Sequence, residues 1–438
     1  MTKAWALFGR QHRLAQRLRS VVRAGSLLGL WLALGSVAAQ AAQHRHRHHH
    51  ARHAHRALAQ GPWVPFKAAL LEDADTGTIL YANNEHVTWP PASMAKMMLL
   101  LVAEDQIRSG RFSFNDPVRV SAVAAYTGGS RLGLHVGDVY PLGELMKAAL
   151  IRSANDAAVA VAEKIAGSTQ ACVRLMNQRA QSLHMFHTFY GTVDGLPPTP
   201  GHDVDFTDAY DLAILAREII YHTDLLKWSS QESADFDGAL ILRNTNHLIG
   251  RFDGCDGIKT GFTYHAGFNV TATAKRGDMR LIAVILGAPS NPERFRQAAH
   301  ILEWGFQTYT VAEPVKRGQP LPVQVRVGSG FAVQPIAASG TRVLVPRDDL
   351  ANINVQYQMP SSINSPVPAG TPLGSVVVRD GTRILGQVPA LYPLGVDGAA
   401  VALPATSDLR FVSVAPLSGV GAPTTPSASA RPIDGAVR

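Results

Sequence analysis

The chain has 438 residues, 46% of them hydrophobic, which is enough for two folded domains with a sizeable core. Its formal net charge of +8 is concentrated at one end, because residues 1–56 contain ten Lys or Arg and no acid. Subtracting ten from +8 leaves −2 for the remainder, so the composition excludes a general nucleic-acid-binding surface on the folded part.

The first 41 residues have the three-part pattern of an export signal. Basic residues end at Arg23, an apolar run covers 24–34, and small residues follow at 35–41. The run is shorter than the ~20 apolar residues that a membrane span needs. We therefore expect residues 1–41 to direct export to the periplasm. Whether this segment is cleaved or anchors the chain to the inner membrane is left open.

Residues 42–61 form a segment rich in histidine and arginine, with the run HRHRHHHARHAHR at 44–56. Such a composition cannot bury a core, so we expect an unstructured linker whose charge rises as the pH falls. Metal binding is the alternative, but no spacing resembles a fixed coordination site. We predict no metal and no cofactor for this protein.

From residue 62 the pattern becomes that of a folded α+β domain, which we place at 62–311. Two strands are expected around a turn with Gly77, and a helix is expected at 94–107, buried because residues 97–103 are apolar on every side. Antiparallel strands and covering helices indicate a layered fold. The remaining predicted elements are helices at 142–150, 156–166, 209–221 and 292–309 and strands at 259–275 and 279–286.

Helical patterns disappear beyond residue 311. Short β-like runs punctuated by Gly, Pro and Asp indicate a small all-β domain at 312–394. Residues 395–438 are dominated by Ala, Pro, Ser, Thr and Gly, so we expect a disordered tail. The β-like runs lie at 322–327, 341–345, 354–357, 375–378 and 387–392.

A serine and a lysine lie three residues apart, Ser93 and Lys96, where the predicted buried helix begins. This spacing places both side chains on one helical face, where they can touch. The helix N-terminus stabilises negative charge on the serine oxygen, and burial near a second cation such as Lys259 lowers the pKa of a lysine. The pair therefore fits a nucleophile and its general base. A capping serine beside a surface lysine is the alternative.

Ser153 and Asn155 are separated by one residue, at the turn between two predicted helices. In an extended turn both side chains face the same way. The hydroxyl can then relay a proton, and the amide can bind a substrate amide. The alternative for Asn155 is to cap the helix that follows.

Lys259, Thr260 and Gly261 open a predicted strand. The glycine permits close approach of another backbone, so a substrate peptide can pair along the strand. Lys259 and Thr260 offer a positive charge and a hydroxyl to a carboxylate. The amides of Phe262 and Ser93 can together form an oxyanion hole. An ordinary turn before a strand is the alternative.

The three motifs, in this order, indicate a serine enzyme that opens peptide or β-lactam bonds through an acyl-enzyme. On these motifs, residues 66–309 resemble the serine-type D-alanyl-D-alanine carboxypeptidases, the low-molecular-mass penicillin-binding proteins. Residues 312–392 resemble the C-terminal β-rich domain of that family more weakly. The resemblance extends to the segments 129–139, 192–197, 207–211, 242–246 and 256–263.

This resemblance implies the penicillin-binding/serine β-lactamase-like transpeptidase fold and the release of the terminal D-Ala from peptidoglycan stem pentapeptides. It implies that Ser93 is acylated, by substrate or by β-lactams, with Lys96 as its base and Ser153 and Asn155 completing the proton network. The expected partners are stem peptides and β-lactams, without nucleic acid. The implied substrate-binding residues are Lys259, Thr260, Gly261, Phe262, Thr263 and Arg294.

Membrane attachment is left open. Members of the family often end in an amphipathic helix on the membrane, whereas residues 395–438 lack the apolar period and basic face of such a helix. Cys172 and Cys255 are the only cysteines, and the sequence leaves open whether they pair.

Three other functions compete with carboxypeptidase activity. A class A β-lactamase needs a glutamate for deacylation, and residues 187–211 contain five Asp but no Glu. A DD-endopeptidase of the same family would carry identical motifs. A non-catalytic penicillin-binding wall protein is disfavoured by the intact Ser93, Lys96 and Lys259.

Overall fold

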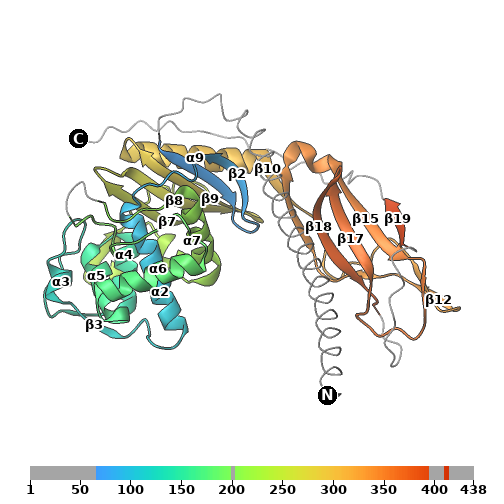
Figure 1. Ribbon diagram of the computed structural model, residues 1–438, viewed down its shortest axis with the longest axis horizontal. Helices are drawn as coiled ribbons and strands as arrows, with labels where there is room; N and C mark the ends of the chain where they lie inside the picture. Colours follow the sequence, from blue (N-terminus) through green and yellow to red (C-terminus); the bar gives the residue numbers. More distant parts are fainter. Residues whose placement is uncertain (1–65, 199–202, 394–408, 414–438) are drawn as a thin grey trace, which may run out of the picture. The chain divides into compact units, whose positions relative to one another are not determined.

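The computed structural model describes residues 66–198, 203–393 and 409–413. The chain divides into two compact units, residues 1–305 and 306–438, which we describe separately (Figure 1). The expected export signal at 1–41, the linker at 42–61 and most of the tail lie outside the described residues. No described helix combines the length and the hydropathy needed to cross a bilayer.

The first unit is built on a five-stranded antiparallel sheet that joins distant parts of the sequence. The hairpin of β1 (Ala68–Asp73) and β2 (Thr78–Asn83) is confirmed, and β1 pairs with β9 (Met279–Ala288) near the end of the unit. The strand order is β2-β1-β9-β8-β7. Strand β7 (Cys255–Thr263), which carries the third motif, is therefore an edge strand, paired only with β8 (Gly267–Arg276).

Helices cover both faces of this sheet (Figure 1). Alternate residues of the strands face opposite layers. Leu70 and Val284 belong to the core shared with the helices that follow the hairpin, whereas Leu71 and Leu281 pack against Gly305 of α9. The helices are α2 (Ala95–Arg108), α4 (Leu142–Ile151), α5 (Asn155–Ala166), α6 (Thr169–Ser182), α7 (Ala209–His222) and α9 (Asn291–Thr308).

Helix α2 is the centre of this core, as its apolar sequence predicts. Every residue from Ala95 to Glu104 is buried, including Lys96. Short elements complete the unit and close its edges. They are η1 (Ala92–Met94), α3 (Ala122–Ala125), α8 (Leu226–Ser229), the pair β3 (Pro117–Arg119) and β4 (Val139–Pro141), and the hairpin β5 (Ser233–Phe236) and β6 (Leu240–Arg243).

One expectation for this unit is wrong, and one long helix was not predicted. The single strand expected over 259–275 is a hairpin, β7 and β8, that turns at 264–266. Helix α6 was not expected, because only Cys172, Met176 and Ala180 form its buried stripe. Its start nevertheless carries a capping signal, since the Ser168 hydroxyl accepts a hydrogen bond from the Ala171 amide.

The second unit is all-β, as expected. Alternate residues of β14 and β15 are buried, and together with a run of buried valines in β17 they supply much of its core. Its sheets have the orders β13-β18-β17-β15-β19, β12-β11-β16 and β10-β14. The strands are β10 (Tyr309–Val315), β11 (Val325–Val327), β12 (Phe331–Val333), β13 (Ile336–Ala337), β14 (Thr341–Pro346), β15 (Ile353–Pro360), β16 (Ser362–Ile363), β17 (Pro372–Asp380), β18 (Arg383–Leu391) and β19 (Leu409–Ser413), with the 3-10 helix η2 (Arg347–Asn352).

One strand falls where we expected only a disordered tail. Strand β19 lies within 395–438 and pairs antiparallel with β15. The sequence Leu409-Arg410-Phe411-Val412-Ser413 has the hydrophobic content of a strand, but it is short and surrounded by Pro, Ser and Gly. The composition of the surrounding residues therefore hides the strand in the sequence.

We predict that Leu100→Ala destabilises the first unit by about 2–5 kcal/mol, because it leaves a cavity in the buried centre of α2. The measurement is urea unfolding followed by tryptophan fluorescence, which reports this unit because the tryptophans of the described residues, Trp89, Trp228 and Trp304, all precede residue 306. Val123→Ala is the control, since Val123 is 62% exposed and should change the free energy of unfolding by less than about 0.5 kcal/mol. Equal effects of the two substitutions would contradict the central position of α2.

Candidate active site

Ser93 lies on the short 3-10 helix η1, immediately before α2. The Pro91 carbonyl accepts a hydrogen bond from the Met94 amide at 3.2 Å, which closes the turn. Ala92 has a φ of +50°, a conformation that is rare outside glycine. Asn269 of β8 holds the turn from the sheet, because its Nδ2 donates to the Pro90 carbonyl at 2.9 Å. The serine is thus presented at a fixed, partly strained bend.

Lys96 contacts the serine directly. Its Nζ donates to Ser93 Oγ at 2.9 Å and to the Asp194 carbonyl oxygen at 2.7 Å, and the side chain is 0% exposed. Burial lowers the pKa of Lys96 to about 8, although the charges of Asp194, Asp205 and Asp156 act in the opposite direction. An uncharged amine is therefore accessible near neutral pH at hydrogen-bond distance from a serine hydroxyl.

The third motif lies against this turn. Gly261 has no room for a side chain, because a Cβ there would stand 2.4 Å from the Pro91 carbonyl oxygen. The backbone that requires a glycine at this position is therefore the turn at Pro91 of the protein itself, and not the substrate peptide that we expected. Lys259 is 1% exposed, and burial together with the positive charges of Lys96 and Arg294 lowers its pKa well below the ordinary value. Two lysines in one buried region cannot both keep a full charge.

The other residues of β7 are occupied in different ways. The Thr260 hydroxyl donates to Thr245 Oγ1 at 2.8 Å. Phe262 is 44% exposed. The Thr263 hydroxyl accepts from the Ala266 amide at 3.0 Å and so closes the β7–β8 turn. Of these three residues, Thr263 is the one whose side chain holds its own hairpin.

The second motif has a different geometry from the extended turn that we expected. Ser153 has a φ of +64°, and Asn155 is the first residue of α5, with Ala154 as its N-cap. The Asn155 side chain does not cap the helix. Its Nδ2 donates to the Gly128 carbonyl at 2.7 Å, while its buried Oδ1 has no hydrogen-bond partner among the described residues. No hydrogen bond of the described part joins Ser153 to Ser93 or Lys96.

Asp156 fixes the segment that faces the second motif. The carboxylate is 0% exposed and accepts hydrogen bonds from the amides of Leu132, Gly133 and Leu134 at 2.8–3.1 Å. The Asn155 amide donates in turn to the Ser130 carbonyl at 2.7 Å. The sequence analysis did not assign a role to Asp156. The sequence feature that could have indicated this role is a carboxylate at the start of a helix that is otherwise rich in alanine and valine.

The segment that includes Asp194 is anchored to the same turn. Gly195, with a φ of +77°, packs so closely that a Cβ would lie 1.8 Å from the Ala92 carbonyl oxygen. The buried carboxylate of Asp205 holds this segment by accepting from the amides of Gly191 and Thr192, at 2.7 and 2.9 Å, and from the Thr192 hydroxyl. Asp194 and Asp205 are two of the five aspartates whose presence, in place of a glutamate, argued against a β-lactamase. Their structural role was not predicted.

Arg294 lies in the first turn of α9 and is 6% exposed. One of its terminal nitrogens donates to the carbonyls of Gly261 and Asn269, at 3.0 and 3.2 Å. The guanidinium also stands 4.7 Å from the ring centroid of Phe295, and burial lowers its pKa to about 10. The arginine thus holds β7 and β8 from behind and keeps a positive charge near Lys259.

The two cysteines take no part in this chemistry. Both are free thiols, and Cys172 is buried in α6. Cys255 begins β7, as its position near Lys259 suggested. Burial raises the pKa of each thiol to about 12, so neither forms a thiolate nucleophile.

Two families of known proteins match the chain. The family described as D-alanyl-D-alanine carboxypeptidase matches residues 56–290, and that described as the C-terminal domain of penicillin-binding protein 5 matches residues 309–397. The chain is similar to D-alanyl-D-alanine carboxypeptidase DacF of Bacillus subtilis (strain 168), with 33% identity over 329 residues that cover 74% of this chain and 84% of that protein.

Solved structures are similar over the same parts. Penicillin binding protein 6B from Escherichia coli is 30% identical, with a TM-score of 0.62, and the match covers 76% of this chain and 97% of that one. Penicillin-binding protein D2 from Listeria monocytogenes, in the ampicillin-bound form, is 28% identical, with a TM-score of 0.52 and coverage of 56% and 99%.

We predict that the Lys96 amine titrates with a midpoint near pH 8, because burial disfavours its charged form. The amine is then mostly charged below this pH and mostly neutral above it. The measurement is NMR of protein with isotope-labelled lysine, and the Lys96→Arg variant identifies the signal. A midpoint near 10.5 would show that the ammonium is not destabilised in this pocket.

Proposed function

The chain belongs to the D-alanyl-D-alanine carboxypeptidase family and is a serine-type D-Ala-D-Ala carboxypeptidase, and from this premise we propose how its residues divide the reaction. Ser93 is the nucleophile and Lys96 its general base. The observation that carries this assignment is the 2.9 Å hydrogen bond between Lys96 Nζ and Ser93 Oγ inside a buried pocket. The reaction removes the terminal D-Ala from a peptidoglycan stem pentapeptide.

The Asp194 carbonyl orients the base. A neutral amine has two hydrogens and one lone pair. One N–H donates to the Asp194 carbonyl oxygen, 2.7 Å away, and the lone pair can then accept the Ser93 hydroxyl proton. Ser93 Oγ attacks the carbonyl carbon of the D-Ala–D-Ala bond as its proton passes to Lys96. The amides of Ser93 and Phe262 stabilise the oxyanion that forms.

The substrate peptide lies along the open edge of β7. An edge strand presents unpaired backbone groups, and an extended peptide can complete the sheet there. Lys259, Thr260 and Arg294 supply the positive potential and the hydroxyl for the terminal carboxylate, with Gly261, Phe262 and Thr263 forming the rest of this edge. The Asn155 Oδ1, a buried acceptor without a protein partner, suits a substrate N–H.

Proton transfer to the leaving group completes acylation. Ser153 passes its proton to the amine nitrogen of the departing D-Ala as the C–N bond breaks, and takes in exchange the proton that Lys96 received from Ser93. The shortened peptide is then an ester of Ser93, and Lys96 is neutral again. Water attacks the ester while Lys96 accepts its proton, and Lys96 returns that proton to Ser93 Oγ as the bond to the stem tetrapeptide breaks. β-Lactams form the same ester by opening their ring, in line with the ampicillin-bound relative.

We also propose that the enzyme works outside the cytoplasm, in the periplasm. Stem peptides are part of the cell wall, and the first 41 residues have the charge and hydropathy pattern of an export signal. The domain limits that we propose are 62–311 and 312–394, supported by family matches that cover residues 56–290 and 309–397. Attachment to the inner membrane is not part of the proposal.

The central experiment compares the wild type with Ser93→Ala. Wild-type protein should release D-Ala from a stem pentapeptide and should bind a fluorescent penicillin covalently. In Ser93→Ala we expect no label and at least a thousand-fold slower release, because the nucleophile is gone. Ser109→Ala, an exposed serine at the end of α2, is the control and should behave as wild type.

Two results would overturn parts of this proposal. A label on Ser93→Ala would reject the nucleophile. A labelled wild type that cuts a cross-linked peptide dimer but releases no D-Ala from the pentapeptide would identify an endopeptidase instead.

Arg294→Gln should reduce the preference for a substrate with a free terminal carboxylate. Two pentapeptides are compared, one ending in a carboxylate and one in a carboxamide. We expect the ratio of their kcat/KM values to fall about ten-fold or more, because a charge-assisted contact contributes about 1.5–3 kcal/mol. Glutamine keeps a donor for the Gly261 and Asn269 carbonyls, so β7 stays in place. An unchanged ratio would limit Arg294 to holding the sheet.

A further inference from the structure

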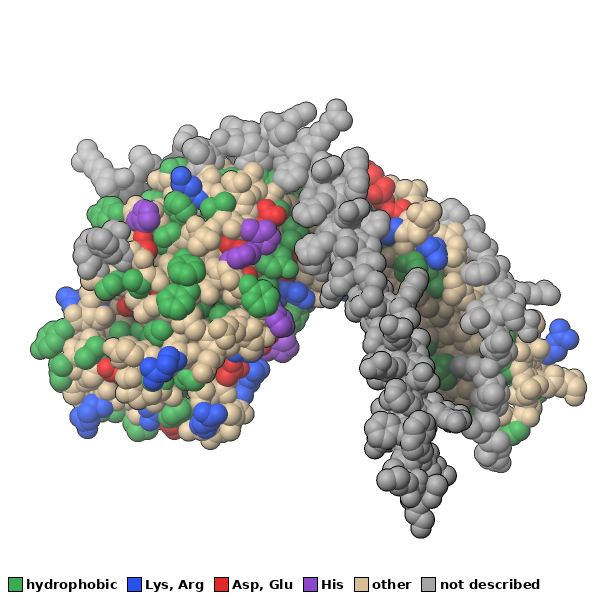
Figure 2. Space-filling view, viewed as in Figure 1, with side chains coloured by type: hydrophobic (Ala, Val, Ile, Leu, Met, Phe, Trp, Pro, Cys, Tyr) green, Lys and Arg blue, Asp and Glu red, His purple; other side chains and the backbone are tan. Residues whose placement is uncertain are grey.

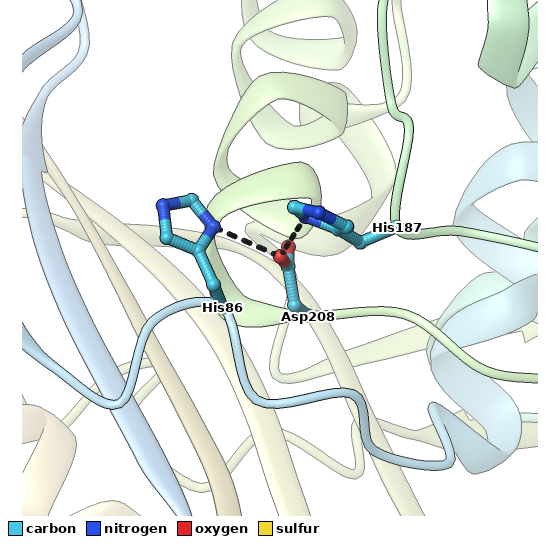
Figure 3. Close-up of side chains that lie close together, drawn as sticks. All are labelled: His86, His187 and Asp208. Carbon is cyan, nitrogen blue, oxygen red and sulfur yellow. Dashed lines mark hydrogen bonds and ion pairs between the residues drawn. The ribbon is translucent and has the colours of Figure 1, made fainter.

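Two histidines and an aspartate converge on the surface of the first unit, apart from the residues assigned to catalysis. Nδ1 of His86 lies 3.1 Å, and Nδ1 of His187 2.8 Å, from the same carboxylate oxygen, Oδ2 of Asp208. Figure 3 shows the two rings reaching this carboxylate from different loops, with Asp208 at the start of α7. Each of the three side chains offers one ligand atom, and these three atoms lie within 4.8 Å of one another.

The burial of Asp208 distinguishes this cluster from an ordinary surface ion pair. The carboxylate side chain is 0% exposed, whereas the two imidazoles are 53% and 51% exposed. Among the described residues, Asp208 forms ion pairs with these two histidines and with no Lys or Arg. A buried carboxylate with no Lys or Arg beside it is a suitable ligand for a bound cation.

A second buried carboxylate increases the local negative potential. Asp211, three residues further on α7, is 1% exposed and accepts hydrogen bonds from the His187 amide at 2.8 Å and the Thr188 hydroxyl at 2.7 Å. A divalent cation bound by Asp208 would offset both carboxylates.

We infer that His86, His187 and Asp208 form a binding site for a divalent transition metal, with Zn²⁺ as its probe. Imidazole nitrogen together with carboxylate oxygen suits zinc rather than calcium or magnesium, which prefer all-oxygen sites. Zinc bonds of about 2.0–2.1 Å place tetrahedral ligand atoms about 3.3 Å apart, so the Nδ1–Oδ2 distances of 3.1 and 2.8 Å would lengthen by a few tenths of an ångström when a metal replaces the hydrogen bonds. Because the two imidazoles are half exposed, water can complete the coordination of a metal bound there. Figure 2 shows histidines at the surface of this unit, some of them beside acidic groups.

The surrounding hydrogen bonds fix the carboxylate in a ligand orientation. The other oxygen of Asp208, Oδ1, accepts from the Asp211 amide at 2.7 Å as the N-cap of α7. This bond leaves Oδ2 free to face the histidines. A metal ion bound at Oδ2 would then lie on one side of the carboxylate, with the positive N-terminal end of α7 on the other. A hydrogen-bonded carboxylate ligand of this kind is typical of protein metal sites.

The ligands come from three segments that frame the catalytic turn. Backbone pairs Trp89–Thr207 and Phe189–Phe206 already join these segments close to the cluster. His86 precedes the turn with Ser93, and His187 precedes the segment with Asp194, the partner of Lys96. A metal held by all three segments would therefore strengthen the frame around the pocket, whether or not Ser93 has its proposed role.

The test is thermal unfolding of the full chain with and without Zn²⁺. A ligand that binds only the folded state raises the melting temperature, and at a hundred times its dissociation constant the shift should be about 5 °C or more. Asparagine replaces histidine in His86→Asn and His187→Asn, because its side-chain N–H stands in for Nδ1–H but is a poor zinc ligand. His135→Ala is the matched control, since the exposed His135 contacts a single carboxylate, Asp138.

We expect zinc to raise the melting temperature of the wild type and of His135→Ala, and not that of the double variant His86→Asn, His187→Asn. Equilibrium dialysis should then count one zinc fewer on the double variant, since the histidine-rich segment at 44–56 is the same in every protein compared. An equal shift in wild type and double variant would place the effect elsewhere and overturn the site. No shift in any of them would leave the cluster as a purely hydrogen-bonded one and would overturn it too.

Discussion

The burial of a single lysine amine is the constraint on which the rest of this active site depends. Lys96 stands with 0% exposure in an apolar helix, where a charged ammonium is costly. The fold offers it two polar partners, Ser93 Oγ and the Asp194 carbonyl oxygen. Burial destabilises the charged ammonium and so leaves a neutral amine that can act as a base. Catalysis and core packing therefore depend on the same side chain.

Holding those partners in place requires segments that are distant in the sequence. Asn269 positions the backbone before Ser93 from the sheet, while Asp205 holds the segment of Asp194. Glycines at 195 and 261 let the two neighbouring segments approach the turn more closely than any side chain would allow. The site is therefore positioned both by side chains outside it, Asn269 and Asp205, and by the close approach of backbone segments at the two glycines.

The sequence predicted the parts of this arrangement that are local. The spacing of Ser93 and Lys96 on one helical face, the buried helix and the strand with Lys259 follow from residues close together in the chain. The bend at Ser153 and the contact of Gly261 with Pro91 were not predictable, because both depend on long-range packing. Helix α6 was missed for a different reason, since its buried stripe is narrow, and the cluster at His86 joins residues more than 100 positions apart.

The position of β7 at the rim of its sheet has a consequence for the protein as a solute. A catalyst that recognises main chain must keep a row of amide and carbonyl groups without partners, which is also what drives strands of separate molecules to associate. Here the row is bordered by the turn against Gly261 and by the exposed rings of Phe262 and Tyr264. A single extended peptide fits between these side chains more readily than the edge strand of a second molecule. The side chains beside β7 therefore hinder edge-to-edge association of two enzyme molecules.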